Sequence, residues 1–444
     1  MVKDISIVGS GLVGVVLAIS LKKKGYTVTV YDRSEDIRNI DFRGRSINLA
    51  LSDRGWRILT ELGIDGEVRE LGIPMSARAI HTESGEVKYQ QYSIKRDSIW
   101  AISRGGLNKD LISIAEREGV VFRFDTPIWD IDLKEGILYT AEHERDQWMA
   151  IKTDLIFGAD GAYSRVRGKM QKQSRFEYQQ SYLHLGYKEL RIEAGVNGEH
   201  KLPKNSFHIW PRKDFMFIAL ANVDGSFTCT LFMPYEGEIS FKTVVSDDEI
   251  NSFFTTYFKN VENLIPNYLE QYKENPVNSL VTMKCFPWVS EGKVALIGDA
   301  AHAVVPFYGQ GLNAGLEDVY VLNKIISESK EDDWETIFEK YQDERKPNGD
   351  AIAELSYRNF KEMSEDTADD MFLLRKKIEG KFAAQYPDLW LPLYDRVTFS
   401  TESYVSALAE GDRQARIMDQ VMSVDNINEK WDRDEVMDII KDLL

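Results

Sequence analysis

Apolar runs at the start of the chain predict a strand, a turn, a helix and a second strand in succession. Residues 5–8 are strand-like, residues 9–14 form a glycine-rich turn, and residues 15–24 have a composition that permits a helix. Residues 27–31 are again strand-like and end at Asp32. This order is typical of the parallel sheet of an α/β domain.

The middle of the chain changes character and predicts antiparallel strands. Residues 215–220 and 227–233 are strand-like, with the turn signal Asp224-Gly225 between them, and positions 227, 229, 231 and 233 would share one face. Residues 294–297 return to a buried type of strand. After Pro347 the pattern is helical, with breaks near Pro387 and Pro392.

Composition and charge narrow the class of protein. The 444 residues include 55 basic and 72 acidic side chains, a net charge of −17, which argues against binding nucleic acid or anionic membranes through the overall field. Cys229 and Cys285 form no CxxC pair, so we expect no metal site, no disulfide framework and a reducing compartment. Residues 5–21 carry no charge and could pass for a secretory signal, but the fixed spacing of their glycines argues against a signal peptide and favours the glycine-rich turn. No uncharged apolar run reaches the ~18 residues of a membrane span.

The glycine-rich turn has the spacing of a dinucleotide-binding loop. Gly9-x-Gly11-x-x-Gly14 lies between a strand and a helix, where the glycines permit a tight turn, close approach of a pyrophosphate and close helix packing. The free N–H groups of the helix would face the phosphates. Asp32, at the end of the second strand, can hydrogen-bond a ribose hydroxyl. This pattern alone leaves FAD and NAD open.

Two further motifs favour a flavin. The first is a strand that runs into the Gly158-Ala159-Asp160-Gly161 turn, and the second is Gly298-Asp299, followed by a glycine-rich stretch over residues 306–315. Asp299 lies at the carboxyl end of a strand, where open α/β sheets place their ligands. A helix that begins near Leu312 would direct its dipole at a flat ring, which would stabilise an anionic reduced flavin.

These three motifs, in this order, resemble the single-component FAD-dependent aromatic hydroxylases, the family of p-hydroxybenzoate hydroxylase. The resemblance covers the chain from Met1 to about Asn348 and implies an α/β fold: a Rossmann-like FAD-binding domain, an antiparallel β-sheet substrate domain and a C-terminal helical region. The expected FAD-binding parts are 1–72, 97–175 and 285–346, the substrate parts are 73–96 and 176–284, and the helical region 347–444 would close the active site.

The resemblance also implies which residues contact the cofactor. Asp32 stands where the family usually has Glu, and Trp129 matches in position but not in residue type. Asp160 would organise the pyrophosphate and nicotinamide region, whereas His302 is expected to be structural because the chemistry belongs to the flavin. The expected FAD contacts are Gly9, Gly11, Val13, Gly14, Asp32, Arg33, Ala50, Arg104, Trp129, Asp160, Asp299, Pro306, Gly311, Leu312 and Asn313.

Further segments resemble the branch of this family that hydroxylates L-kynurenine. They lie at residues 44–52, 72–75, 208–212, 227–234, 306–315 and 392–400. The resemblance implies that Arg78 binds the substrate carboxylate, for which a planar guanidinium is better suited than a lysine. The other expected substrate contacts are Tyr92, Asn359, Tyr394, Phe232, Phe307 and Met363. Asn359, Met363 and Tyr394 are the candidate lid.

The implied reaction has two halves and is a step of tryptophan degradation and NAD precursor synthesis. NADPH reduces FAD, and a flavin C4a-hydroperoxide formed with O2 then transfers a hydroxyl group to the ring, giving 3-hydroxy-L-kynurenine. The aromatic amine already activates its ortho carbon, so a strong protein base is less necessary. The protein must exclude water from the site. Because the C-terminal run 428–444 is charged, we expect no membrane tail and a cytoplasmic enzyme.

Three other interpretations remain open from the sequence. The nearest is a flavin hydroxylase of another aromatic acid such as a hydroxybenzoate, which would not need the set Arg78, Tyr92, Asn359 and Tyr394. A different class is a non-catalytic flavin-binding redox sensor, since motifs indicate binding better than catalysis. The third is a Rossmann dehydrogenase that uses NAD. FAD retained through purification would exclude the NAD dehydrogenase. NADPH oxidation under air would separate a flavin hydroxylase from the non-catalytic redox sensor.

Overall fold

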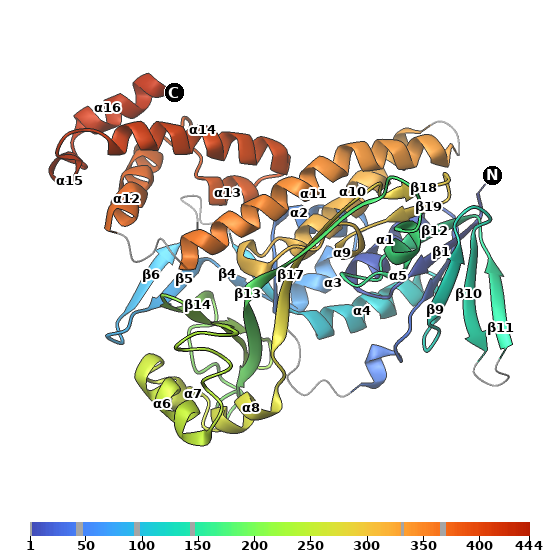
Figure 1. The fold of residues 1–444 in the computed structure, drawn as a ribbon, viewed down its shortest axis with the longest axis horizontal. Coiled ribbons are helices and arrows are strands. Elements are labelled where there is room, and N and C mark those ends of the chain that lie inside the picture. Colours follow the sequence, from blue (N-terminus) through green and yellow to red (C-terminus); the bar gives the residue numbers. More distant parts are fainter. Residues whose placement is uncertain (1, 41–47, 93–97, 143–146, 330–332, 365–369) are drawn as a thin grey trace.

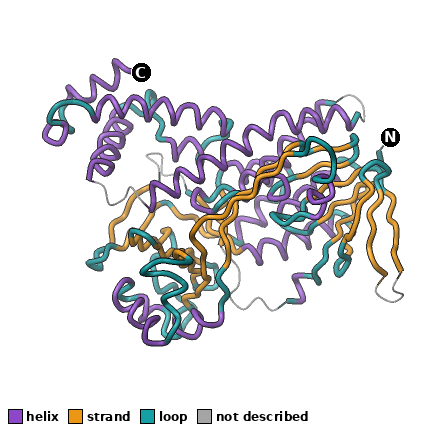
Figure 2. The backbone as a smooth tube through the Cα atoms, viewed as in Figure 1, coloured by secondary structure: helices purple, strands orange, loops and turns teal. Residues whose placement is uncertain are grey.

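The structure is a computed structural model that describes residues 2–40, 48–92, 98–142, 147–329, 333–364 and 370–444 (Figures 1 and 2). Part of the segment 44–52, which contributed to the resemblance, therefore lies outside the described residues. The described chain forms two larger sheets, with a group of helices at the C-terminal end.

The first large sheet is the predicted parallel sheet. Its six strands are ordered β18 (Val289–Ser290), β19 (Val294–Leu296), β12 (Leu155–Gly158), β1 (Asp4–Val8), β2 (Thr27–Tyr31) and β8 (Val121–Arg123). β1 pairs in parallel with β12 and with β2. Every residue of β12 and β19 is buried, as expected for strands covered on both faces. The helix α1 (Leu12–Lys23) packs against α4 (Arg104–Arg117) and α10 (Gly311–Glu328).

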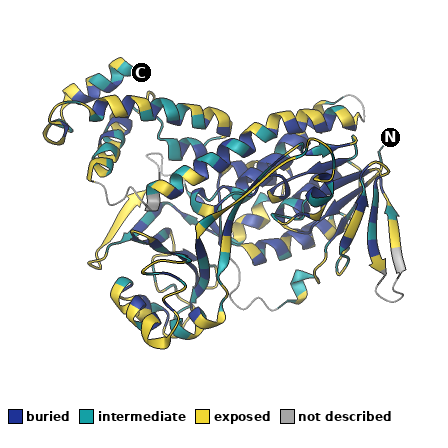
Figure 3. Ribbon diagram, viewed as in Figure 1, coloured by how far each residue is buried: buried dark blue, intermediate teal, exposed yellow. Residues whose placement is uncertain are grey.

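The second large sheet contains the predicted antiparallel strands. Its order is β17 (Asn278–Phe286), β13 (Glu177–Ile192), β16 (Phe227–Pro234), β15 (Phe215–Ala221), β14 (Ser206–Arg212), β5 (Ala77–His81) and β6 (Val87–Gln91). Within this sheet β14 and β5 run parallel and are far apart in sequence. The other neighbouring strands described in the sheet run antiparallel. β6 forms an exposed edge, coloured yellow in Figure 3.

The alternation predicted for β16 is confirmed. Phe227, Cys229, Leu231 and Met233 pack into one apolar core, which also takes in residues of α6 (Asp247–Tyr257), α7 (Val261–Leu264) and α8 (Tyr268–Glu274). The opposite face of the strand is also covered, since Thr230 and Phe232 line a cavity.

Two small sheets and several short elements were not predicted from the sequence. One sheet joins β3 (Asn48–Leu51), β7 (Ile99–Ser103) and β4 (Gly72–Met75), and the other joins β9 (Ile128–Asp132), β10 (Ile137–Glu142) and β11 (Gln147–Lys152). The remaining short elements here are η1 (Ile37–Asn39), α2 (Asp53–Glu61), α3 (Asp65–Glu70), α5 (Arg165–Met170), α9 (Asp299–His302) and η2 (Pro306–Tyr308).

The C-terminal part is helical, with α12 to α16 grouped at one end of the molecule (Figure 1). The helices are α11 (Trp334–Ser364), α12 (Asp370–Gln385), α13 (Leu393–Thr398), α14 (Tyr404–Met422), α15 (Ile427–Lys430) and α16 (Asp434–Leu443). The break between α12 and α13 contains Pro387 and Pro392, as predicted. Pro347, however, lies inside α11, so the expected start of the helical region falls within a helix. Among the described residues, no helix combines the length and apolar character needed to cross a membrane.

Candidate active site

A cavity of about 490 Å³ is lined by strands of the second large sheet, by segments that follow β1, β12 and β19 of the first, and by residues of α11 and α13. Its volume suits a small-molecule site, since such pockets usually measure about 300–1,000 Å³. Many of the residues predicted from the sequence line it: Gly11, Val13, Ala50, Arg78, Tyr92, Arg104, Phe232, Asp299, Pro306, Phe307, Gly311, Leu312, Asn359 and Tyr394.

The glycine loop between β1 and α1 leaves room for a ligand at its second glycine. Gly9 has a φ of +109°, and a Cβ on Gly14 would lie 2.3 Å from the carbonyl oxygen of Gly9. Both glycines therefore permit tight packing. A Cβ on Gly11 would meet no atom within 4 Å, and Gly11 is the N-cap of α1 without a side-chain cap. The first N–H groups of the helix are thus available to an anion.

Asp32 holds this loop in place. One of its carboxylate oxygens accepts hydrogen bonds from the backbone N–H of Ser10 at 2.7 Å and from the Ser10 hydroxyl at 2.8 Å. The other accepts from the N–H of Ser34 at 2.9 Å. Neither Asp32 nor the exposed Arg33 lines the cavity, so their contact with a ribose stays a prediction.

Asp299 and Arg104 place a pair of opposite charges at the cavity. Asp299 follows Gly298, whose φ of +62° forms the sharp turn after β19. Its side chain is surrounded by protein yet accessible from the cavity. Burial raises the pKa of the Asp299 carboxyl, and the positive charge of Arg104 opposes that rise. The pair can accept and donate hydrogen bonds to a polyhydroxylated chain.

The N-terminus of α10 is held against β3 by Asn313. The Asn313 side chain accepts from the N–H of Ser52 at 2.9 Å and donates to the carbonyl oxygens of Ala50 and Gly309 at 2.8 and 2.9 Å. It is fully buried and does not line the cavity. Gly311 and Leu312, at the first turn of the helix, do line it, so this helix end faces the cavity as predicted.

Arg78 lies at the other end of the cavity among tyrosine rings. Its guanidinium carbon is 4.3 Å from the ring centre of Tyr394 and 5.1 Å from that of Tyr92. The two rings are nearly parallel, with centres 5.9 Å apart, and Tyr308 stacks on the far side of Tyr394 at 5.6 Å. Stacking of this kind fixes the plane of the guanidinium. Tyr308 was not predicted as a site residue.

Aromatic side chains close the same end of the cavity. The rings of Phe232 and Phe307 lie 5.2 Å apart, and Phe307 contacts Phe360 at 4.8 Å. The Asn359 amide donates to the carbonyl oxygen of Phe307 at 2.8 Å, which ties α11 to η2. The prediction for Met363 falls outside the residues whose side chains the structure describes.

Several predicted FAD residues do not line the cavity. Besides Asp32, Arg33 and Asn313, these are Gly9, Gly14, Trp129 and Asp160. Trp129 is 46% exposed on β9 and stacks under Arg165 at 4.8 Å. The Asp160 carboxylate accepts from the N–H groups of Arg165 and Val166 at 2.7 and 3.3 Å, and its burial raises its pKa. Asp160 therefore holds the start of α5, while its neighbour Gly161 lines the cavity.

His302 belongs to a buried chain of charges rather than to the cavity. Its Nε2 lies 2.6 Å from Asp318, which accepts from Arg345 at 2.7 Å. Arg345 also pairs with Glu317 at 2.9 Å, and Glu317 pairs with Arg54 at 2.8 Å. Burial favours a protonated Asp318, but His302 and Arg345 outweigh it and lower the pKa of that carboxyl. The structural role predicted for His302 fits this arrangement.

Other cavity residues were missed because no motif marks them. Those on the second sheet alternate along its strands, which is the signal that could have found them. Among them is Tyr187, whose pKa is raised to about 12, chiefly by burial. The others on these strands are Ile80, Gln90, Phe207, Ile209, Pro211, Met216, Ile218, Leu220 and Thr230. Among the described residues, no three His, Cys, Asp or Glu side chains are grouped to hold a metal ion.

Comparisons with known proteins agree with the geometry. A family model described as an FAD binding domain matches residues 3–356. The chain is 56% identical over 442 residues to kynurenine 3-monooxygenase of Christiangramia forsetii, covering 100% of this chain and 99% of that protein. It is 42% identical over 434 residues to kynurenine 3-monooxygenase of Dictyostelium discoideum, covering 95% and 93%.

Solved structures share the fold. The tetrameric form of 2-methyl-3-hydroxypyridine-5-carboxylic acid oxygenase has a TM-score of 0.67 at 21% identity and covers 82% of this chain and 93% of its own. The tetracycline destructase Tet(51) has a TM-score of 0.61 at 16% identity, with coverages of 88% and 99%. The predicted fold class and the resemblance to flavin hydroxylases are confirmed.

Proposed function

The chain belongs to the kynurenine 3-monooxygenase family of FAD-binding proteins, and on that premise we propose that it hydroxylates L-kynurenine to 3-hydroxy-L-kynurenine with O2 and NADPH. The observation that carries the proposal is Arg78, which lines the cavity and contacts the stacked rings of Tyr92 and Tyr394. A carboxylate-bearing aromatic substrate would bind there.

The residues present fit FAD. Gly11 opens onto the cavity without a side chain in the way, and the uncapped start of α1 suits a pyrophosphate. Asp299 and Arg104 suit the polyhydroxylated part of the cofactor, and Leu312 brings the start of α10 to its ring. FAD would supply the oxygen-activating redox chemistry, which no amino-acid side chain provides.

The chain's own task is to hold and orient the substrate. Arg78 can donate two parallel hydrogen bonds to the carboxylate, and the Tyr92 and Tyr394 rings keep that fork in plane. Phe232 and Phe307 offer apolar surface to the aromatic ring. The orientation of the ring follows from these two anchors.

Water exclusion is the second task, and the cavity wall serves it. Aromatic and aliphatic side chains make up most of the wall at the Arg78 end, with Met216, Ile218 and Leu220 facing inward from β15. The amine on the kynurenine ring activates the carbon to be hydroxylated, so the wall need not supply a strong base. A wall that excludes water would keep the activated oxygen from being lost as H2O2 before it reaches the ring.

The experiment combines purified FAD-loaded protein with NADPH, O2 and L-kynurenine, and quantifies 3-hydroxykynurenine by mass spectrometry. Product near one per NADPH consumed is the expected result. NADPH loss with only H2O2 formed would contradict L-kynurenine as substrate and favour another aromatic acid. No NADPH loss would contradict the redox part of the proposal.

The cytoplasmic location belongs to the same proposal, supported by two buried cysteines without a disulfide.

A further inference from the structure

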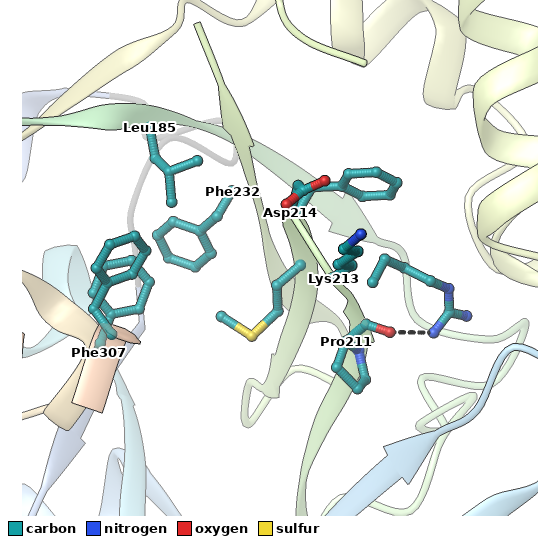
Figure 4. Close-up of a pocket in the computed structure, with 10 residues that line it drawn as sticks. Leu185, Pro211, Lys213, Asp214, Phe232 and Phe307 are labelled. Carbon is teal, nitrogen blue, oxygen red and sulfur yellow. Dashed lines mark hydrogen bonds between the residues drawn. The ribbon is translucent and has the colours of Figure 1, made fainter. Parts of the chain in front are cut away.

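A shallow depression lies on the outer side of the Arg78 end of the cavity (Figure 4). The turn between β14 and β15 forms one side of it, and side chains from β13, β16, η2 and α11 form the other. Figure 4 shows Phe232 and Phe307 at one end, with Lys213 and Asp214 toward the other. The depression thus has an aromatic end and a charged end.

The depression and the cavity share part of their lining. Pro211, Met216, Phe232 and Phe307 line both spaces. Met216 is partly exposed and unbranched, and methionine adapts its shape at low cost. A passage between the two spaces would require movement of these shared residues, and Met216 is the most adaptable of the four.

The charged rim is formed by two side chains of opposite sign. Lys213 and Asp214 are both exposed, and neither forms an ion pair with another residue of the described chain. Lys213 has a φ of +37°, a left-handed conformation that favours glycine. The adjacent Arg212 is not available to a ligand, since it donates to the carbonyl oxygens of Tyr257 at 2.6 Å and Pro211 at 2.6 Å.

We propose that the depression is an outer recognition site through which an aromatic amino-acid zwitterion reaches the cavity. The proposal rests on the proposed function, because FAD at the Gly11 end leaves the substrate to arrive from the Arg78 end. Lys213 would attract the carboxylate, Asp214 the ammonium, and the shared aromatic residues the ring. A carboxylate that passes these residues first would then meet Arg78.

The test obstructs the rim and measures rates of binding. Cys229 and Cys285 are buried, and burial raises the pKa of both thiols, so neither is a ready nucleophile. In an Asp214→Cys variant the new thiol is therefore selectively alkylated with a bulky polymer maleimide. Leu389→Cys, at a position 52% exposed in the C-terminal part, carries the same label as the control.

Stopped-flow measurement of the flavin absorbance change, with FAD-loaded protein and no NADPH, gives the association and dissociation rates of L-kynurenine. Blocking a path leaves both end states unchanged, so the labelled Asp214→Cys protein should show both rates lowered by about tenfold or more with Kd unchanged. The labelled control should keep wild-type rates. Wild-type rates in the labelled Asp214→Cys protein overturn the proposal.

A second variant tests the charge at the rim without a label. Lys213→Glu should lower the association rate severalfold at low salt, with the difference shrinking as salt rises. An association rate equal to that of the wild type at every salt concentration overturns the role of Lys213. If L-kynurenine gives no spectral response in the wild-type protein, the proposed function fails and this inference fails with it. If the wild-type protein responds and both variants bind at wild-type rates, this inference alone is refuted.

Discussion

Replacing Arg78 with alanine should remove the carboxylate anchor of the substrate while leaving FAD in place. The Arg78 side chain contacts Tyr92 and Tyr394 at the substrate end, and the residues that fit FAD lie at the other end of the cavity. The variant should therefore purify with a wild-type flavin content, and its stimulation of NADPH oxidation by L-kynurenine should be largely lost.

The size of the effect follows from the environment of the guanidinium. Truncating one partner of a desolvated, hydrogen-bonded charge pair costs about 2–4 kcal/mol, which is an increase in Kd of about 30-fold to 1,000-fold. Arg78→Lys keeps the charge but loses the planar fork that stacks on Tyr394 at 4.3 Å. A loss of about 1 kcal/mol is expected for it, or about fivefold in Kd.

The assay is a titration of the flavin absorbance with L-kynurenine and with its decarboxylated analogue. Without a carboxylate the contact with Arg78 disappears, so Arg78→Ala should bind the analogue at least as tightly as the wild type does. Arg57→Ala is the matched control, since Arg57 stacks on Tyr320 at 3.8 Å and is not part of the cavity lining. Equal affinity of Arg78→Ala and wild type for L-kynurenine would refute the assignment.

Three further predictions concern the loop and the second sheet. Gly14→Ala crowds the glycine loop at a cost of about 1–3 kcal/mol and should lower the melting temperature, measured by differential scanning calorimetry. Gly11→Ala should fold normally and lose only FAD affinity, measured as flavin content after purification. Asp32→Ala removes two hydrogen bonds to Ser10 and should raise the FAD Kd in equilibrium dialysis; an unchanged Kd contradicts the loop-holding role. Burial lowers the pKa of His81 to about 4 from 6.5. As the pH drops from 6.5 toward 4, the unfolded chain therefore binds a proton that the folded chain does not, and the free energy of unfolding falls. Urea unfolding at about pH 7 and about pH 5 should show a smaller fall in this free energy for His81→Gln than for the wild type.

The parts of the fold that follow from short-range patterns could be predicted from the sequence. The strand–turn–helix start is local, and the alternation in β16 depends only on a two-residue period. The small β3–β7–β4 sheet could not be predicted, because its strands are short and pair across long stretches of chain. The first part of α11 could not be predicted, because the proline at position 347 is typical of a helix boundary, whereas α11 continues through it.

The candidate site could be predicted where a motif marks it. Gly11, Asp299 and Leu312 follow from glycine spacing and strand ends, and all line the cavity. Tyr308 escaped prediction because it stacks on Tyr394, which is 86 positions away in the sequence. Asp32 has a second role that its motif did not indicate, since its carboxylate accepts hydrogen bonds from the loop itself.

The buried charges explain why the C-terminal segment belongs to the site. Arg54, fully buried in α2, donates to the carbonyl oxygen of Val397 at 2.9 Å across 343 positions, and it pairs with Glu317 across 263 positions. At the other end of the same chain of charges, Asp318 accepts from the N–H of Gly298 at 3.1 Å. Removing one member of such a network leaves its partner buried and uncompensated. The turn that carries Asp299 and the segment that carries Tyr394 are therefore held by one set of buried charges, and both residues line the same cavity.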